Sequence, residues 1–221
     1  MKQKLDLPKG LMIDGEHVWN QILDKGPADR PALFLDRDGV VVVEVNYLHE
    51  PYKAELIPGA AQVITRANQL EIPVVLITNQ AGIARGLYGW SEFAATQERL
   101  IHLLEAEGAY LNAVYACPHH EKGTKKLYAH KDHPARKPNP GMLERAADHL
   151  RIVMPQSWVI GDRASDIGAG RLAGLAGGLH VKTGHGSDDG ELEAVQAEAR
   201  ENYEVRFADS IAEGLNLPLF S

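Results

Sequence analysis

PALFLDRDGV, residues 31–40, is an apolar run that ends in two carboxylates and a glycine. Large apolar residues without polar alternation predict a strand that is covered on both faces. Gly39 allows the chain to turn away directly after Asp38. The carboxyl ends of strands in an open parallel sheet face the ligand crevice. This stretch therefore predicts a buried strand and, at its end, a site.

Similar apolar runs recur along the chain and alternate with longer amphipathic stretches. The runs that we interpret as further strands cover residues 73–78, 112–116, 157–160 and 178–182. Helices are expected over 58–70, 91–107, 139–150 and 165–175, and three of them begin at residues that favour helix starts, Pro58, Ser91 and Asn139. Strand–helix alternation of this kind predicts an α/β fold, a doubly wound parallel sheet with flanking helices and right-handed crossovers.

Three segments fall outside this alternation. Residues 1–30 form an N-terminal extension, which leaves 31–221 as a single domain. Residues 117–137 form an inserted loop rich in His and Lys, and loops of this length usually carry a function or are disordered. The third segment, 183–204, has seven acidic residues and one Arg from 188 onward, so it is expected to be a solvated helix or a mobile loop. A last strand and a short helix follow within 203–215.

Composition restricts the class of protein further. The 221 residues, 44% of them hydrophobic, suffice for one well-buried domain. With 23 Lys and Arg against 30 Asp and Glu, the net charge is −7, which disfavours nucleic acid and anionic membranes as partners. The single cysteine, Cys117, excludes an internal disulfide. No apolar run approaches the roughly 20 residues of a membrane span. We therefore expect a soluble, cytoplasmic protein. A monomer is the default expectation, and the sequence leaves the oligomeric state open.

Asp36 and Asp38 form the first candidate site. Side chains two residues apart leave a strand on the same side, so both carboxylates can face one small volume. Two buried like charges are costly unless a cation joins them, and Mg²⁺ commonly binds one or two carboxylates together with a substrate phosphate. The simpler alternative is an acidic turn that follows a strand.

Polar residues follow the other predicted strands as well. Thr78 and Asn79 offer a hydroxyl and backbone N–H groups to phosphate oxygens. The remaining candidates are the cations Arg85, Arg136, Lys137 and Arg163 and the carboxylates Asp162 and Asp166. Acids for a metal, a hydroxyl donor and cations for phosphate together favour phosphoryl transfer, in which catalysis is mostly positioning and charge neutralisation.

The motifs LFLDRDG, ITN, RKP and GDRASD, in this order over residues 31–182, resemble the haloacid-dehalogenase (HAD) superfamily of aspartyl-phosphate phosphatases. The segments NYLHE (46–50), TNQAGIARG (78–86), CPHH (117–120) and RKPNPGM (136–142) are similar to one group within it, the D-glycero-D-manno-heptose 1,7-bisphosphate phosphatases, which are close to the histidinol-phosphate phosphatases. The resemblance implies a Mg²⁺-dependent phosphomonoesterase. The stretches after Asp38 and after Thr78 are too short to hold a large cap domain.

The resemblance also implies a role for each matching residue. Asp36 would be the nucleophile and Asp38 the general acid and base. Mg²⁺ would be held by Asp36, Asp162 and the backbone carbonyl of Asp38, with support from Asp166. The residues expected to bind substrate or phosphate are Thr78, Asn79, Arg85, Arg136, Lys137 and Arg163.

The inserted loop departs from the pattern of the group. Relatives hold a structural Zn²⁺ with Cys-x-His and a later Cys-x-Cys, but here the second pair is missing. Four of the ten histidines lie between 119 and 133. Imidazole can replace thiolate at zinc, which makes Cys117, His119, His130 and His133 a candidate site. Asp132 or His120 could substitute for one ligand, and the alternative is a loop without metal.

Four alternatives to a heptose bisphosphate 7-phosphatase remain. A histidinol-phosphate phosphatase or a broader sugar-phosphate phosphatase would share them. A phospho-acceptor signalling domain would use a similar acidic Mg²⁺ site, but Asp38 next to Asp36 favours turnover. A zinc-loop module for nucleic acid is disfavoured by the acidic balance.

Overall fold

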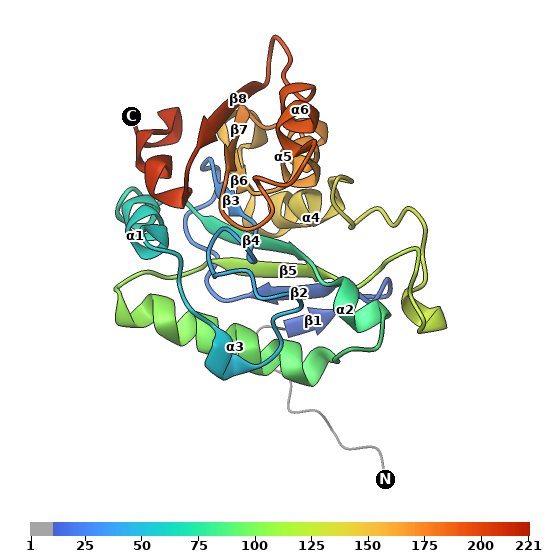
Figure 1. The fold of residues 1–221 in the computed structure, drawn as a ribbon. Coiled ribbons are helices and arrows are strands. Elements are labelled where there is room, and N and C mark those ends of the chain that lie inside the picture. Colours follow the sequence, from blue (N-terminus) through green and yellow to red (C-terminus); the bar gives the residue numbers. More distant parts are fainter. Residues whose placement is uncertain (1–10) are drawn as a thin grey trace.

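In the computed structural model, which describes residues 11–221, an eight-stranded sheet is flanked by helices (Figure 1). The strands are β1 (Leu11–Ile13), β2 (Trp19–Ile22), β3 (Leu33–Leu35), β4 (Val74–Asn79), β5 (Ala113–Cys117), β6 (Trp158–Gly161), β7 (Gly177–Val181) and β8 (Glu204–Ala208). The helices are α1 (Ala60–Gln69), α2 (Ala81–Ala84), α3 (Trp90–Ala106), α4 (Gly141–Leu150), α5 (Ala164–Leu172) and α6 (Glu191–Gln196).

The strand order is β1-β2-β5-β4-β3-β6-β7-β8. The six strands from β5 to β8 in this order pair in parallel, which confirms the predicted doubly wound α/β fold. Within the described chain, only short connections link β3 to α1 and β4 to α3, so no large cap covers the carboxyl ends of these strands. The order reverses at β3, whose neighbours are β4 and β6, and ligands bind at such a reversal in doubly wound folds.

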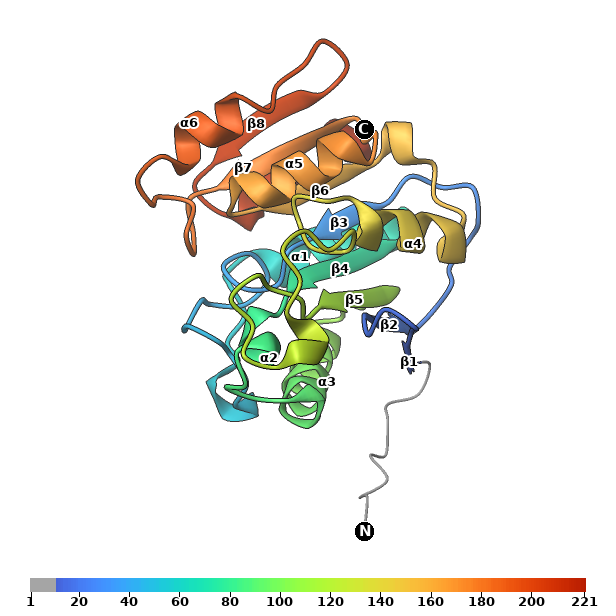
Figure 2. The same ribbon diagram turned by 90° about the vertical axis from the view of Figure 1, so that its right-hand side faces the viewer.

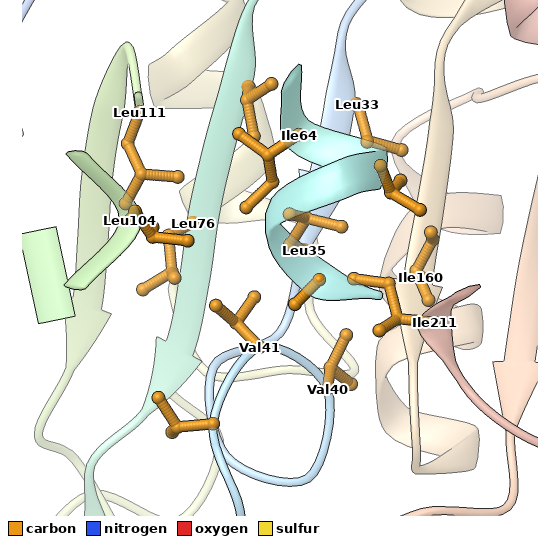
Figure 3. Close-up of a cluster of buried hydrophobic side chains, with 14 of the residues drawn as sticks. Leu33, Leu35, Val40, Val41, Ile64, Leu76, Leu104, Leu111, Ile160 and Ile211 are labelled. Carbon is orange, nitrogen blue, oxygen red and sulfur yellow. The ribbon is translucent and has the colours of Figure 1, made fainter. Parts of the chain in front are cut away.

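Alternating side chains of the sheet enter two different cores. Leu33 and Leu35 of β3 belong to the core under α1 and α3, together with Ile64 and Leu104 (Figure 3). Phe34, between them, belongs to the core under α4, α5 and α6 on the opposite face (Figure 2). This alternation follows from the two-residue period of a strand. Because helices cover both faces, every residue of β3 is apolar and fully buried.

A β-hairpin that was not predicted lies within the N-terminal extension. β1 and β2 pair antiparallel, and β2 extends the sheet by pairing antiparallel with β5. The Asp14 carboxylate closes the turn by accepting hydrogen bonds from the backbone N–H groups of Glu16 and Val18. Trp19 of β2 is fully buried against Phe93, with ring centroids 5.0 Å apart. Residues 1–10 lie outside the described chain, and the domain boundary at residue 30 stays a prediction.

Ser91 and Asn139, the two residues expected as helix N-caps, do not cap α3 and α4. α3 starts at Trp90 because Glu92 accepts a hydrogen bond from the Gly89 N–H, so Ser91 is not its N-cap. α4 starts at Gly141, and the amide of Asn139 instead donates to the backbone carbonyl of His133. Glu92 caps α3 in place of Ser91, and the Asn139 amide is engaged by the loop that precedes α4.

Candidate active site

Three carboxylates converge where β3 and β6 end. Asp36 directly follows β3, Asp162 directly follows β6, and Asp166 lies in the first turn of α5. All three are buried, and ligand oxygens from each lie within 4.8 Å of one another. Among residues 11–221 this is the one group of three His, Cys, Asp or Glu side chains that meets this criterion. A compact set of oxygen donors suits a hard divalent cation such as Mg²⁺.

Lys137 lies against this group from the loop that precedes α4. Its ammonium Nζ is 2.8 Å from Asp36 Oδ1, 2.6 Å from Asp166 Oδ1, and donates to the Ile77 carbonyl at 2.9 Å. Burial by itself would lower the pKa of Lys137, but Asp166 and Asp36 raise it above its ordinary value. Lys137 therefore stays charged although it is only 3% exposed.

One ammonium does not neutralise three buried acids. Burial, and then the neighbouring carboxylates, raise the pKa of Asp162 to about 8. Burial also raises the pKa of Asp36 to about 7, even though Lys137 opposes the shift. A divalent cation would favour the ionised form of both groups, so the site has the electrostatics of a metal site.

Gly39 is required for this geometry. Its φ is +80°, a conformation that L side chains rarely adopt, and a Cβ here would lie 2.4 Å from Asp162 Oδ2. The same Asp162 oxygen accepts a hydrogen bond of 2.7 Å from the backbone N–H of His185. The Asp36–Gly39 turn and the loop after β7 can therefore both approach Asp162.

The remaining predicted residues surround the same space. A cleft of about 480 Å³ is lined by residues that include every predicted phosphate, catalytic and magnesium ligand, namely Asp36, Asp38, Thr78, Asn79, Arg85, Arg136, Lys137, Asp162, Arg163 and Asp166. Asn79 fixes Lys137 by a reciprocal pair of hydrogen bonds to its backbone, each 3.1 Å long. Residues that are far apart in the sequence thus line one cleft at the carboxyl edge of the sheet.

Two arginines line one wall of the cleft. Arg85 donates to the hydroxyl of Tyr47 at 2.6 Å, and its other terminal nitrogen lies 3.4 Å from His120 Nε2. Arg136 donates to the carbonyl of His119 at 2.9 Å. Burial, together with nearby Arg85, lowers the pKa of Arg136 from its usual value. Two guanidinium groups close together are a receptor for an anion.

The acidic segment forms part of the opposite wall. Glu191, the first residue of α6, accepts a hydrogen bond of 2.7 Å from the backbone N–H of Ala164, at the start of α5. It also lies 3.4 Å from Arg163 Nη1, so Arg163 has a partner within the chain. Val195 of α6 is fully buried. Part of the run that looked solvated therefore packs on the domain and shapes the site.

The predicted zinc ligands are close in space but not assembled. The rings of His119 and His133 stack with centroids 3.8 Å apart, and His130 lies 5.2 Å from His133. No three donor atoms of this set lie within 4.8 Å of one another in the described chain. Burial raises the pKa of the Cys117 thiol to about 11. The alternative ligand His120 accepts a hydrogen bond from the Lys122 N–H.

Several cleft residues escaped the sequence analysis. They include Glu44, Tyr88, His185 and Glu191, whereas Tyr47, Gln80 and His120 lie within the motifs NYLHE, TNQAGIARG and CPHH. Gln80 lies inside the TNQAGIARG motif and could have been found there, because it directly follows Asn79 at the end of β4. Tyr88, His185 and Glu191 lie on segments whose sequence pattern gives no sign of proximity to the site.

The chain is similar to known phosphatases in sequence and in fold. Residues 134–213 match a family model described as HAD-hydrolase-like. The D-glycero-beta-D-manno-heptose-1,7-bisphosphate 7-phosphatase of Mesorhizobium japonicum is 48% identical over 155 residues, which cover 70% of this chain and 71% of the relative. A HAD-like protein of Mesorhizobium loti superposes with a TM-score of 0.73 at 41% identity, covering 84% and 96% of the two chains.

A second solved structure carries a ligand. The D,D-heptose 1,7-bisphosphate phosphatase of B. bronchiseptica, complexed with magnesium and phosphate, superposes with a TM-score of 0.69. It is 29% identical, and the match covers 84% of this chain and 96% of that one. The fold and the acidic site thus define a phosphomonoesterase of the HAD-like class. Within this class, the chain belongs to the family of the heptose 1,7-bisphosphate phosphatases.

No helix in residues 11–221 has both the length and the apolar character that crossing a membrane requires.

Proposed function

We propose that this protein removes the 7-phosphate from D-glycero-β-D-manno-heptose 1,7-bisphosphate in a Mg²⁺-dependent reaction. The observation that carries the proposal is the buried Asp36 carboxylate, held by Lys137 beside Asp162 and Asp166 at the end of β3. The substrate is proposed from the names of relatives that share 36–48% of aligned residues with this chain. Mg²⁺ is the cofactor of HAD phosphatases, and the acids present here fit it.

In the proposed reaction, a carboxylate oxygen of Asp36 attacks phosphorus and forms an aspartyl phosphate while the bond from phosphorus to the sugar oxygen breaks. Asp38 gives its proton to that leaving oxygen. It then takes a proton from the water that attacks the aspartyl phosphate, which releases inorganic phosphate and regenerates Asp36. The partly exposed position of Asp38, with 19% of its side chain accessible, supports this assignment.

Phosphate is held by three groups of this chain in the proposal. Thr78 and the backbone of Asn79 donate hydrogen bonds from the end of β4, and Lys137 supplies a fixed positive charge. Bound Mg²⁺, held by Asp36, Asp162 and the backbone carbonyl of Asp38 with support from Asp166, would neutralise charge on the transferring phosphoryl group.

Arg85 and Arg136 favour a bisphosphate over the histidinol-phosphate alternative. A second phosphate would meet two guanidinium groups, whereas the ammonium group of histidinol phosphate would be repelled by them. Arg163 is assigned to substrate as well, but its ion pair with Glu191 makes it the weaker candidate.

Replacing Arg85 with Gln is expected to lower kcat/KM for the heptose bisphosphate about 10–100-fold, because a charge-assisted contact with the second phosphate is lost. Hydrolysis of p-nitrophenyl phosphate, which has one phosphate, should change little. Arg151→Gln removes an exposed arginine that pairs with Asp29 and is the matched control. Equal losses on both substrates would show that Arg85 does not contact a second phosphate.

A substrate panel tests the function itself. Both anomers of the heptose 1,7-bisphosphate, fructose 1,6-bisphosphate and histidinol phosphate are compared by kcat/KM with Mg²⁺ present. The β-anomer should be the best substrate. A preference for histidinol phosphate, or equal rates on all sugar phosphates, would overturn the proposed substrate and leave the phosphatase class intact.

We also propose that Cys117, His119, His130 and His133 hold a structural Zn²⁺ once the loop tightens around it. Within residues 11–221, the buried Nδ1 of His119 has no hydrogen-bond partner, while its Nε2 lies 2.7 Å from the carbonyl of Glu16. A histidine that bonds a carbonyl through one nitrogen commonly binds metal through the other.

Metal analysis of the purified protein should find about one Zn²⁺ per chain, and less in Cys117→Ser, which removes the thiolate ligand. The melting temperature should fall in the variant for the same reason. A wild-type protein that contains no zinc and is no less stable after chelation would remove the metal from the proposal.

We also propose that the protein is cytoplasmic and monomeric and that it has no nucleic-acid or membrane partner.

A further inference from the structure

Two buried side chains hold the carboxylate of Asp38. Arg37 Nε lies 3.1 and 3.2 Å from its two oxygens, and Gln80 Nε2 donates to Asp38 Oδ2 at 3.1 Å. Arg37 and Gln80 are 1% and 2% exposed. Arg37 is itself held by the carbonyl of Leu48 and lies over the ring of Phe93, 5.2 Å from the centroid. These hydrogen bonds fix the Asp38 carboxylate on its buried side, and its other side faces the cleft.

The amide of Gln80 can adopt only one orientation. Its Oε1 faces two donors, the Tyr88 hydroxyl at 2.5 Å and Arg37 Nη2 at 3.3 Å. Its Nε2 faces two acceptors, Asp38 Oδ2 and, at 2.8 Å, the hydroxyl oxygen of Thr78. A flipped amide would direct its oxygen at the Asp38 carboxylate and its N–H groups at Arg37, so the network itself assigns the orientation.

This orientation fixes the role of the Thr78 hydroxyl. Because Thr78 Oγ1 accepts the hydrogen bond from Gln80, its own proton is free to be donated elsewhere. Thr78 lines the cleft, so a phosphoryl oxygen bound there can accept that proton. One amide thus orients both the proposed proton-transfer group and the proposed phosphate donor.

We propose that Gln80, itself oriented by Arg37 and Tyr88, is a positioning residue that holds the side chains of Asp38 and Thr78 in the orientation that phosphoryl transfer requires. The inference rests on the proposed roles of these two residues. Gln80 does not exchange a proton or bind the phosphate. It keeps the Asp38 carboxyl group directed at the leaving oxygen and the Thr78 hydroxyl directed at the phosphoryl group.

Leaving-group dependence separates this role from a purely structural one. A sugar alkoxide needs a proton from Asp38 as it leaves, whereas p-nitrophenolate leaves without one. The ratio of kcat/KM for the sugar phosphate to kcat/KM for p-nitrophenyl phosphate therefore measures proton donation in the first, irreversible step. A misfolded fraction of the protein or a misoriented Thr78 lowers kcat/KM for both substrates alike, so neither changes this ratio.

In Gln80→Met, which keeps the length of the side chain and removes the amide, the ratio should fall about 10–100-fold, because general acid catalysis contributes about 10²–10⁴ and is only partly lost. Both substrates should also lose some rate through Thr78. In Tyr88→Phe, one hydrogen bond to Gln80 is removed while the ring remains, and the ratio should fall about 3-fold. Tyr88→Phe decides the question if Gln80→Met does not fold.

Gln97→Met is the matched control, because Gln97 is a buried amide on α3, outside the cleft, and should leave the ratio unchanged. A ratio that stays within about twofold of wild type in both Gln80→Met and Tyr88→Phe would overturn the proposal, since proton donation would then not depend on the network. The sugar phosphate used is the one that wild type hydrolyses best. If wild type does not hydrolyse the heptose bisphosphate, the proposed function is contradicted, while the role of Gln80 is still tested on the sugar phosphate that wild type does hydrolyse.

Discussion

Replacing Asp36 with Asn should abolish phosphate release, with kcat at least about 10⁴-fold below wild type on every substrate, a loss typical of removing a covalent nucleophile. The amide has the same shape and fits beside Lys137, but it cannot form an acyl phosphate. In wild type, burial raises the pKa of Asp36 to about 7, so its ionised form is destabilised in the folded protein. Asp36→Asn should therefore melt at or above the wild-type temperature when no metal is present.

Stability and activity together make this test specific. The measurements are phosphate release with Mg²⁺ and thermal unfolding in a chelator. Asp209→Asn is the control, because this exposed aspartate pairs with Lys182, neither residue lines the cleft, and the change should alter neither measurement. If Asp36→Asn retained several per cent of wild-type activity, another group would have to be the nucleophile, and the roles proposed for Asp38 and Lys137 would need to be reassigned.

The sequence predicted the carboxylate site well because strand ends are easy to recognise. Asp36, Thr78 and Asp162 each follow an apolar run, and parallel strands bring such ends to one edge of the sheet. Lys137 was predicted from a motif rather than from geometry. That its ammonium would lie between Asp36 and Asp166 depends on the packing of the loop before α4, which no local pattern encodes.

Glu191 was not predicted because its sequence signal favours something else, whereas Gln80 and the N-terminal hairpin lie in segments that carry a usable signal. Glu191 lies in an acidic run, and charge runs are usually solvated, yet it caps the start of α5 from 27 residues away. Gln80 is a neutral amide whose importance comes entirely from its four partners. The N-terminal hairpin had a usable signal, since Asp14-Gly15 lies between two short apolar runs, and Asp-Gly is a strong turn sequence.

Lys137→Met should lower kcat/KM about 10²–10³-fold, the loss expected when one fixed electrostatic group at the transferring phosphoryl is removed. It should also destabilise the protein. The ammonium is buried and lies between Asp36 and Asp166, so its removal leaves two carboxylates without a counter-charge. Breaking a buried ion pair in this way costs about 3–5 kcal/mol. Urea unfolding in a chelator measures this loss, and Lys182→Met, at an exposed ion pair, is the control.

Added Mg²⁺ should recover part of the stability of Lys137→Met, because a cation among Asp36, Asp162 and Asp166 replaces some of the missing positive charge. The double variant Lys137→Met, Asp166→Asn should be more stable than Lys137→Met alone, since it removes one of the unpaired acids together with the base. If the double variant is less stable than either single variant, the two residues stabilise the fold through separate contacts, and Lys137 does not serve as the counter-charge of this acidic site.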